Sequence, residues 1–267
     1  MPTVPQPVLI DFDRVSLAFG EQHVLEDVSF AVRRSETKVL LGETGAGKSV
    51  VLKLAIGLLR PDAGSIEVLG ETVSRLPEAE LYALRRRIGI VFQESALFDS
   101  LSVRDNVAYR LEEERRLDPE AIEARVRACL AAVQLEEAID KMPAELSGGM
   151  QRRVSIARAL ATEPEIMLYD SPTAGLDPIT ATNIMEQIIK LRDVNKVTAL
   201  LVSHRLQDGF LLATHCWDAA RNGLRPSPPE NSHTSFLVLH QQRVVFDGTA
   251  AGLRGSADAY LQHFLQR

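Results

Sequence analysis

The sequence of 267 residues has few cysteines and no long apolar run. Its two cysteines, Cys129 and Cys216, are too few for a disulfide framework and are typical of a protein kept in a reducing compartment. The longest apolar stretch, residues 50–59, contains Lys53 and is far shorter than the ~20 residues that cross a bilayer. The first residues show no charged start followed by an apolar core, so we predict no signal peptide. We therefore expect any link to a membrane to run through a partner.

Basic residues are also in the minority, with 30 Lys and Arg against 36 Asp and Glu and a formal net charge of -6. A general nucleic-acid-binding protein is usually basic, so we do not expect nucleic acid as the main partner. The hydrophobic fraction of 45% and the charged fraction of 25% are ordinary for a globular protein. A chain of this length can bury a core without disulfides, which excludes a disulfide-stapled miniprotein, a collagen and a wholly disordered chain.

The pattern of apolar and turn residues predicts an α/β fold. Short β-branched or aromatic runs predict strands at 8–12, 15–19, 28–32, 38–41 and 66–69. Residues 77–161 are mainly helical in pattern. A strand at 166–169, a helix at 178–191 and a strand at 197–202 follow, and this alternation predicts a parallel core sheet. At the end we expect a surface loop at 221–235, a hairpin of 236–240 with 244–246, and a short helix ending at Arg267.

One glycine-rich segment carries the clearest chemical signal. It fits the pattern G-x-x-x-x-G-K-[ST] and lies between an apolar strand and a predicted helix. Its members are Gly42, Glu43, Thr44, Gly45, Ala46, Gly47, Lys48 and Ser49. Glycines let main-chain N–H groups point at a phosphate, and the helix N-terminus adds partial positive charge. In such loops the lysine reaches the β- and γ-phosphates and the Ser49 hydroxyl binds Mg²⁺. A chance glycine turn is the alternative, against which the flanking strand and helix argue.

A second magnesium ligand is expected at the end of a buried strand. Residues 166–169 are mostly apolar and are followed by Asp170. Many strands end in Asp, so this residue alone is weak evidence. Beside the phosphate loop, however, it is the carboxylate with which such folds hold Mg²⁺.

Further motifs resemble those of ATP-binding cassette (ABC) ATPases. The signature motif of that family resembles the run Leu146, Ser147, Gly148, Gly149, Met150 and Gln151. Gln93 is similar to the family's Q-loop glutamine, Asp177 to the D-loop aspartate and His204 to the switch histidine. Phe19 falls where the family stacks an aromatic ring on adenine. The resemblance covers residues 10–248, with the motifs in the family's order.

This resemblance implies a P-loop NTPase fold with ATP and Mg²⁺ as ligands. It implies an ABC nucleotide-binding domain at 8–250, with a parallel core sheet, an N-terminal antiparallel β subdomain, a helical signature subdomain at about 94–161, and a helical tail at 251–267. The implied metal ligands are Ser49, Gln93 and Asp170. Ser147, Gly148 and Gly149 begin a helix whose N-terminus is a second anion site. In the family a head-to-tail homodimer joins the two sites, so these residues and Gln151 would cover the ATP of the second copy.

Residue 171 departs from the family's pattern. In the family a glutamate follows the metal-binding aspartate and orients or deprotonates the attacking water, whereas here the residue is Ser171. Losing a general base lowers a rate by about 10²–10⁴-fold. Phosphoryl transfer has a loose transition state, however, in which positioning the water matters more. We expect slow hydrolysis, with His204 as the main water-positioning group and with Ser171 and Gln93 beside it. A cassette gated by ATP that hydrolyses little or none is the alternative.

Four segments are moreover similar to the Mla/MCE-type lipid-transport ATPases within that family. They are residues 92–101, 105–109, 142–146 and 177–180. This similarity implies phospholipid transport with a permease dimer and an MCE-domain substrate-binding protein, at the cytoplasmic face of the inner (plasma) membrane. Leu97 and Phe98 lie close to Gln93 and either dock a permease helix or pack in the core. Alternative functions are an amino-acid importer, a lipoprotein exporter, or a soluble ABC protein that acts on nucleic acid or ribosomes.

Several charged residues allow two interpretations each. Arg152 and Arg153, on the signature helix, either steer phosphate or are exposed. The arginines at 85–87 either meet lipid headgroups or a permease, or form a solvated charge run. The other histidines have no metal-ligand spacing and are predicted to be surface or turn residues; they are His23, His215, His233, His240 and His263.

Overall fold

The computed structural model describes residues 6–227 and 233–266. Its central sheet is built from β3 (Thr37–Gly42), β6 (Ile88–Val91), β7 (Ile166–Asp170), β8 (Thr198–Val202), β11 (Thr234–His240) and β12 (Arg243–Thr249). The order of these strands across the sheet is β12-β11-β3-β8-β7-β6. Neighbours pair in parallel except β11 and β12, which form an antiparallel hairpin. This confirms the predicted parallel core sheet and the predicted hairpin.

Both faces of the central sheet are covered, which explains its nearly continuous apolar strands. In β3, the side chain of Leu40 packs with α1 (Lys48–Ala55) in one core cluster. Val39 and Leu41 pack on the opposite face with α6 (Pro178–Asn195) and α7 (Leu206–Thr214). Because successive strand residues point to opposite faces, one short run supplies two cores.

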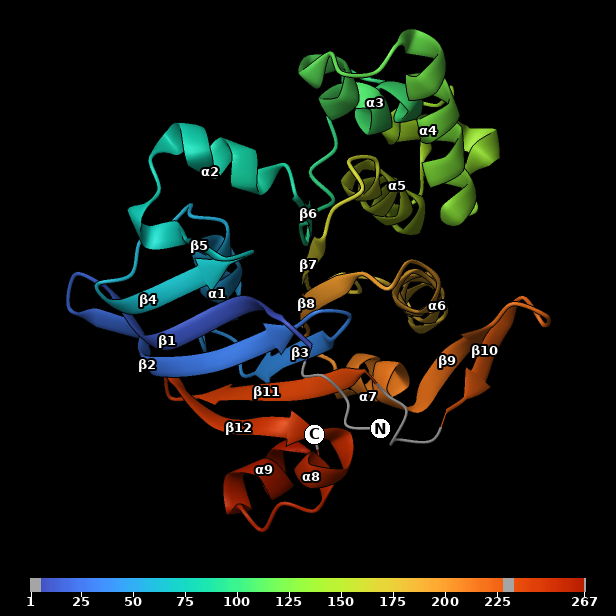
Figure 1. The fold of residues 1–267 in the computed structure, drawn as a ribbon. Coiled ribbons are helices and arrows are strands. Elements are labelled where there is room, and N and C mark those ends of the chain that lie inside the picture. Colours follow the sequence, from blue (N-terminus) through green and yellow to red (C-terminus); the bar gives the residue numbers. More distant parts are fainter. Residues whose placement is uncertain (1–5, 228–232, 267) are drawn as a thin grey trace.

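An antiparallel sheet lies beside the central one (Figure 1). Its strands are β1 (Val8–Phe19), β2 (Gln22–Arg33), β4 (Ala63–Val68) and β5 (Glu71–Thr72), in the order β2-β1-β4-β5. The prediction of separate strands at 8–12 and 15–19 was wrong, because β1 continues through a bulge. Arg14 takes a left-handed φ of 50° there, and its N–H donates to Ser29 Oγ at 2.8 Å. The polar residues therefore mark a bulge rather than the end of a strand.

The helical part of the molecule contains α3 (Val103–Glu114), α4 (Pro119–Ala132) and α5 (Gly148–Leu160). Figure 1 shows these helices together at one end of the molecule, beyond β6 and β7. Helix α2 (Glu78–Arg85) precedes β6, and short 3-10 turns occur at Val73–Arg75, Glu136–Ala138 and Pro143–Glu145. This part confirms the predicted helical signature subdomain as a feature of the fold.

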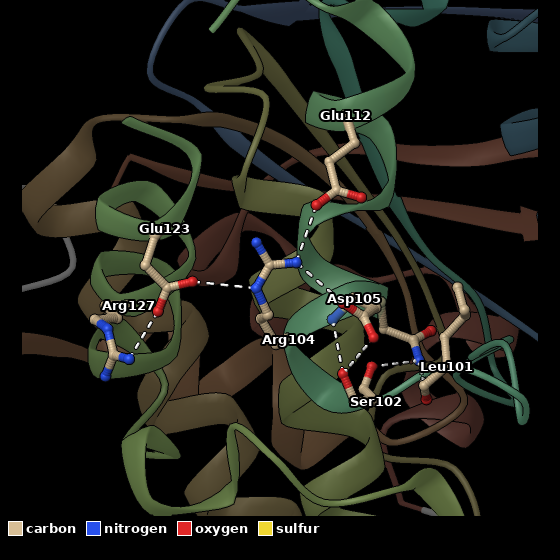
Figure 2. Close-up of polar contacts among 8 residues, drawn as sticks. Leu101, Ser102, Arg104, Asp105, Glu112, Glu123 and Arg127 are labelled. Carbon is tan, nitrogen blue, oxygen red and sulfur yellow. Dashed lines mark hydrogen bonds and ion pairs between the residues drawn. The ribbon is translucent and has the colours of Figure 1, made fainter. Parts of the chain in front are cut away.

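An arginine network fastens α3 to α4. Arg104 on α3 donates to Glu112 at 2.9 Å, to Asp105 at 3.0 Å and, across to α4, to Glu123 at 3.1 Å (Figure 2). Arg127 adds an ion pair to Glu123 at 2.7 Å. The hydrogen bond from Arg104 to Glu112, and to a lesser degree the one to Asp105, raises the pKa of the Arg104 guanidinium above its ordinary value. The two helices are thus joined by charge as well as by their apolar faces.

The segment after α7 differs from the predicted loop at 221–235. Strands β9 (His215–Asp218) and β10 (Gly223–Pro226) pair there as a second hairpin, and residues 234–235 already belong to β11. Arg192 anchors the start of β9, since its guanidinium donates to the carbonyl groups of Leu212 at 2.5 Å and His215 at 2.8 Å. Residues 228–232 of the predicted loop lie outside the described residues.

The C-terminal helix was predicted as one piece, but the structure has two short helices. They are α8 (Ala250–Arg254) and α9 (Ala259–Phe264), and the predicted end at Arg267 lies outside the described residues. In the described ranges no helix has the length and apolar character that crossing a membrane requires.

Candidate active site

The glycine-rich loop joins β3 to α1, as predicted, and its glycines occupy positions that other residues would strain. Gly42 and Gly47 have φ values of 150° and 90°. A Cβ atom at Gly42 would lie 2.5 Å from the Leu239 carbonyl oxygen, and one at Gly47 would lie 2.8 Å from the Val24 carbonyl oxygen. The close approach of neighbouring main chain therefore requires glycine at both positions, and the loop leads directly into the N-terminus of α1.

Lys48 is bent back onto this loop. Its side chain is almost fully buried, at 4% exposure, and its Nζ donates to the carbonyl oxygens of Gly42 at 2.9 Å and Glu43 at 2.7 Å. Burial lowers the pKa of Lys48 to about 8, although Asp170 and Glu43 oppose the shift. A partly desolvated ammonium among main-chain dipoles is a strong binding group for phosphate oxygens.

Ser49 and Asp170 come together from distant parts of the chain. The Ser49 hydroxyl donates to Asp170 Oδ1 at 3.1 Å, which places the first turn of α1 against the end of β7. A hydroxyl and a carboxylate side by side are oxygen ligands of the kind that Mg²⁺ takes together with phosphate oxygens and water. The donor set therefore fits a magnesium ion. Gln93, the third predicted ligand, follows β6 and is exposed, and the contact described for it is made by its main chain.

Ser171 is buried and strained. It is 2% exposed, has a φ of 47°, and its N–H donates to the Val202 carbonyl at 3.0 Å. Within the described part of the chain, its hydroxyl has no hydrogen-bond partner. Non-glycine residues in such conformations persist only where the surroundings fix them, and they gather at functional sites.

His204 lies next to the phosphate loop. It follows β8 and lines a cavity of about 460 Å³ together with Gly42, Glu43 and Thr44. Burial lowers the pKa of His204, the positive charge of Lys48 adds to this effect, and Asp170 opposes it. The imidazole is therefore neutral at neutral pH, so one ring nitrogen can donate and the other can accept a hydrogen bond.

The signature segment forms the capped start of α5. Ser147 Oγ accepts from the Met150 N–H at 3.3 Å, and Gly148 and Gly149 open the helix. A Cβ atom at Gly149 would lie 2.4 Å from Thr180 Cγ2, so this glycine also lets α5 approach α6. Gln151 points its amide back into the chain and donates to the Pro143 carbonyl at 3.0 Å. Its position supports the segment that carries Ser147.

Asp177 and Phe19 lie at the surface. Asp177 caps α6, since its Oδ1 accepts from the N–H groups of Ile179 and Thr180 at 3.0 Å. Hydrogen bonds from Thr180, first of all from its side chain, lower the pKa of Asp177. Phe19 closes β1 and is 52% exposed, so its ring is free to stack on a flat ligand.

Arg152 is a residue whose role sequence reasoning missed. It neither faces solvent nor points at an anion site, because it is buried and donates to the main-chain carbonyls of Phe92 and Gln93. Burial lowers the pKa of its guanidinium. Arg153 likewise donates to main-chain carbonyls, those of Val133 and Gln134. Both predicted interpretations are therefore wrong for Arg152, which instead ties the signature helix to the segment of Gln93. Arg153 is only half-buried, so neither interpretation is decided for it.

The arginines at 85–87 are bound by acidic residues rather than free. Arg85 pairs with Glu78, and Arg87 pairs with Glu165. Arg86 makes a bidentate ion pair with Glu114 on α3: its Nε donates to Oε1 at 2.7 Å and its Nη2 donates to Oε2 at 2.5 Å. The exposed Arg87 agrees with the solvated run that was predicted, whereas Arg85 and Arg86 are partly buried in their ion pairs. Contact of these arginines with lipid headgroups or a permease stays a prediction.

An apolar groove lies between α2, β6 and α3. It has a volume of about 440 Å³ and is lined in part by Tyr82, Ile90, Phe92, Phe98 and Tyr109. Phe98 is 42% exposed and its ring centroid lies 4.6 Å from that of Tyr109. Leu97, by contrast, packs against the core. Of the two predicted roles, core packing therefore applies to Leu97, whereas Phe98 faces the groove.

The fold and the site define the class of P-loop nucleotide-binding ATPases. A parallel sheet carries a lysine-containing phosphate loop, and a carboxylate from another strand end meets the serine of that loop. Within this class, the family model described as ABC transporter matches residues 25–174. The chain belongs to the ABC transporter family, which confirms the resemblance drawn from the motifs.

Several known proteins are similar over most of the chain. The protein TRIGALACTOSYLDIACYLGLYCEROL 3, chloroplastic, of Arabidopsis thaliana is 37% identical over 265 residues, which cover 96% of this chain and 73% of that protein. The intermembrane phospholipid transport system ATP-binding protein MlaF of Escherichia coli K12 is 34% identical over 257 residues, with coverages of 96% and 88%. The dimeric post-hydrolysis structure of the ATP-binding cassette MJ0796, bound to ADP and Pi, superposes with a TM-score of 0.74 at 29% identity, covering 90% of this chain and 98% of that one. The chain is thus an ABC transporter ATPase subunit with MlaF-like relatives.

Proposed function

We propose that this protein is the ATP-hydrolysing subunit of a phospholipid transporter of the Mla/MCE type. In this proposal two copies enclose two ATP molecules and drive a permease dimer, which works with an MCE-domain substrate-binding protein at the cytoplasmic face of the inner membrane. The observation that carries the nucleotide part is the Ser49–Asp170 contact beside the buried Lys48. The similarity to MlaF over 96% of the chain supports the lipid part.

In the proposed complex, each part of the nucleotide is assigned to named residues. Phe19 stacks on the adenine, the loop from Gly42 to Ser49 surrounds the phosphates, and Lys48 binds the outer phosphates. Ser49, Asp170 and Gln93 hold the magnesium ion, which when bound neutralises charge on the phosphate oxygens. Because Lys48 Nζ already donates to carbonyl groups of the loop, ATP binding requires it to exchange those partners for phosphate oxygens.

The second anion site calls for a second copy. The capped start of α5 at Ser147 and the cap of α6 at Asp177 lie at the protein surface and are not part of the Lys48 site in the same chain. In the proposed dimer, Ser147, Gly148 and Gly149 of one copy cover the γ-phosphate held by Lys48 of the other. The dimeric state of the MJ0796 cassette supports this arrangement.

Hydrolysis in this chain has to proceed without a carboxylate at position 171. The neutral imidazole of His204 has the donor and acceptor needed to position a water and the γ-phosphate. The Ser171 hydroxyl is buried without a partner, so it can help to bind that water only after the turn that carries it moves. The proposed turnover is therefore slow. The buried, unpartnered hydroxyl of Ser171 also favours a second candidate, a cassette that ATP closes and that hydrolyses little or none.

The groove at Phe98 is the proposed docking place of the permease. Its aromatic lining and the exposed Phe98 ring suit an apolar segment of a membrane partner. Asn106 shapes the rim of this groove, because its buried amide bonds the Phe98 N–H at 2.8 Å and the Leu101 carbonyl at 3.0 Å. An amino-acid importer or a lipoprotein exporter would use the same groove, so the cargo depends on the partner.

Nucleotide binding is tested by titrating the purified protein with a fluorescent ATP analogue and Mg²⁺. The variant Lys48→Ala removes the buried ammonium, and Lys53→Ala, an exposed lysine of α1, is the matched control. We expect Lys48→Ala to weaken binding by about 30-fold or more, since losing a charge-assisted hydrogen bond costs about 2 kcal/mol. No affinity of the unaltered protein for nucleotide with magnesium would refute the proposal.

Lipid transport is tested by co-purification and reconstitution. We expect a multi-span permease to co-purify with the protein and Phe98→Asp to abolish this association, with the partly exposed Tyr82→Phe as a mild control in the same groove. Vesicles that contain the complex and a fluorescent phospholipid should then show ATP-dependent lipid transfer. Transfer of amino acids or lipoproteins instead of phospholipid would leave the ATPase assignment and overturn the lipid assignment.

A further inference from the structure

Asp208, a buried carboxylate on α7, lies outside the predicted site. It accepts hydrogen bonds from two segments of that site, the one that follows β7 and the one that follows β8. Asp208 is 4% exposed, and its Oδ2 accepts hydrogen bonds from Thr173 Oγ1 at 2.5 Å and from Ser203 Oγ at 2.8 Å. Arg205 Nε approaches Oδ1 at 3.8 Å. We call the group of Thr173, Ser203 and Asp208 the carboxylate bridge.

The two hydroxyls of the carboxylate bridge belong to the segments that surround the reacting phosphate in the proposed function. Thr173 lies two residues after Ser171, in the turn between β7 and α6, and Ser203 directly precedes His204. Both are buried. Ser203 Oγ also accepts from the Arg205 N–H at 3.0 Å. The main chain on both sides of His204 is therefore tied to the same serine, and through it to Asp208.

A carboxylate in this position is informative because burying one is unfavourable unless it is well bonded. An apolar residue would fill the same space without this penalty. What the carboxylate adds is a single acceptor atom, Oδ2, that two hydroxyls from different loops share. Hydrogen bonds to an ionised acceptor are roughly twice as strong as neutral ones. The two loops are thereby held at a fixed separation.

We propose that Asp208 is a positioning residue that fixes the position of His204 relative to the turn that carries Ser171. The proposal rests on the proposed hydrolytic role of His204. In this chain the water must be placed without a glutamate at position 171, so the rate depends on how firmly His204 is held. Small misplacements of a catalytic group, of about 1 Å, lower rates by about 10²-fold.

The test compares Asp208→Asn with a carboxylate variant elsewhere, Asp193→Asn. Asp193 is also bonded on two sides, by Arg192 and by the Trp217 N–H, but it supports the β9 hairpin. We expect Asp208→Asn to lower kcat by about 10- to 100-fold with an ATP Kd within about 3-fold of the unaltered value. Asp193→Asn should change stability without this selective loss of kcat. An unchanged kcat in Asp208→Asn overturns the proposal.

A double variant separates positioning from general destabilisation. If Asp208 acts through His204, Asp208→Asn should have no further effect on kcat when combined with His204→Ala. Multiplicative losses in the double variant would show an independent structural effect and overturn the proposal. Asp208→Glu, which keeps the charge, should retain more activity than Asp208→Asn.

Hydrogen exchange of the nucleotide-free protein provides a readout that needs no turnover. Asp208→Asn should speed amide exchange in both 171–175 and 203–205, while Asp193→Asn should leave these segments unchanged. If the unaltered complex shows no hydrolysis, the proposed function fails while this experiment still decides on the carboxylate bridge. Faster exchange in both segments supports the bridge, and unchanged exchange in either one overturns it.

Discussion

The replacement Ser171→Glu restores the carboxylate that the ABC family carries after its metal-binding aspartate, and it should raise the rate of ATP hydrolysis. A general base contributes about 10²–10⁴-fold, which corresponds to about 3–5 kcal/mol of activation free energy. Because proton transfer matters less in a loose transition state, we expect an increase near the lower end, about 10²-fold. The backbone adds no penalty specific to glutamate, since the φ of 47° is already strained for serine.

The variant should also change stability in a way that nucleotide reverses. Ser171 is 2% exposed and adjoins Asp170, so a second carboxylate there is buried close to a like charge. We expect the nucleotide-free variant to unfold at a lower temperature than the unaltered protein. Magnesium and ATP should recover part of this loss, because they bring positive charge and hydrogen-bonding partners to the site.

The assay is phosphate release by the permease-bound complex at saturating ATP and magnesium. Ser171→Gln is the matched control, since glutamine has nearly the size of glutamate but cannot take a proton. Faster release in Ser171→Glu alone supports a missing base, and equal gains in both variants would show that water positioning limits the rate. An unchanged rate in Ser171→Glu would refute the reasoning that Ser171 limits turnover. Absence of hydrolysis in the unaltered complex would favour the ATP-gated cassette.

Four further predictions test single groups. Free Lys48 loses its proton near a pKa of about 8, whereas bound phosphate keeps it charged, so the ATP affinity measured by titration should fall as the pH rises above about 8. Because burial and Lys48 lower the pKa of His204, kcat should stay level around neutral pH and fall only as the imidazole gains a proton in more acidic buffer; His204→Ala should lack that decline. A double-mutant cycle of Arg86→Ala and Glu114→Ala, read by urea unfolding, should give a coupling of about 1 kcal/mol that shrinks in high salt. Asn106→Ala should lower the free energy of unfolding by about 3 kcal/mol, since its buried amide bonds several main-chain groups of one turn.

The parts of the fold that could be predicted from the sequence are those set by local pattern. The run at 38–41 is apolar after Lys38 and leads into the G-x-x-x-x-G-K-[ST] pattern at 42–49, which suffices to predict a buried strand followed by a phosphate loop and a helix. The start of α4 at Asp118 and Pro119 follows from capping chemistry, and the structure shows the Asp118 carboxylate accepting from the Ala121 N–H at 2.8 Å. The hairpin at β9 and β10 could not be predicted in this way, because prolines and glycine favoured a loop while a distant buried arginine, Arg192, anchors it.

The same difference between local and distant contacts explains what sequence reasoning missed in the site. Ser49 and Asp170 are 121 positions apart, yet each sits in a recognisable local motif, so their meeting could be predicted. Arg152 and Asp208 belong to no such motif: each is a charged residue on a helix, for which a solvated position is the default expectation. Their burial becomes visible only when the segments around Gln93 and His204 are in place to supply partners. Since a buried charge without partners would destabilise the fold, these partners must form together with the core, and the precise arrangement of the site is therefore a property of the whole fold.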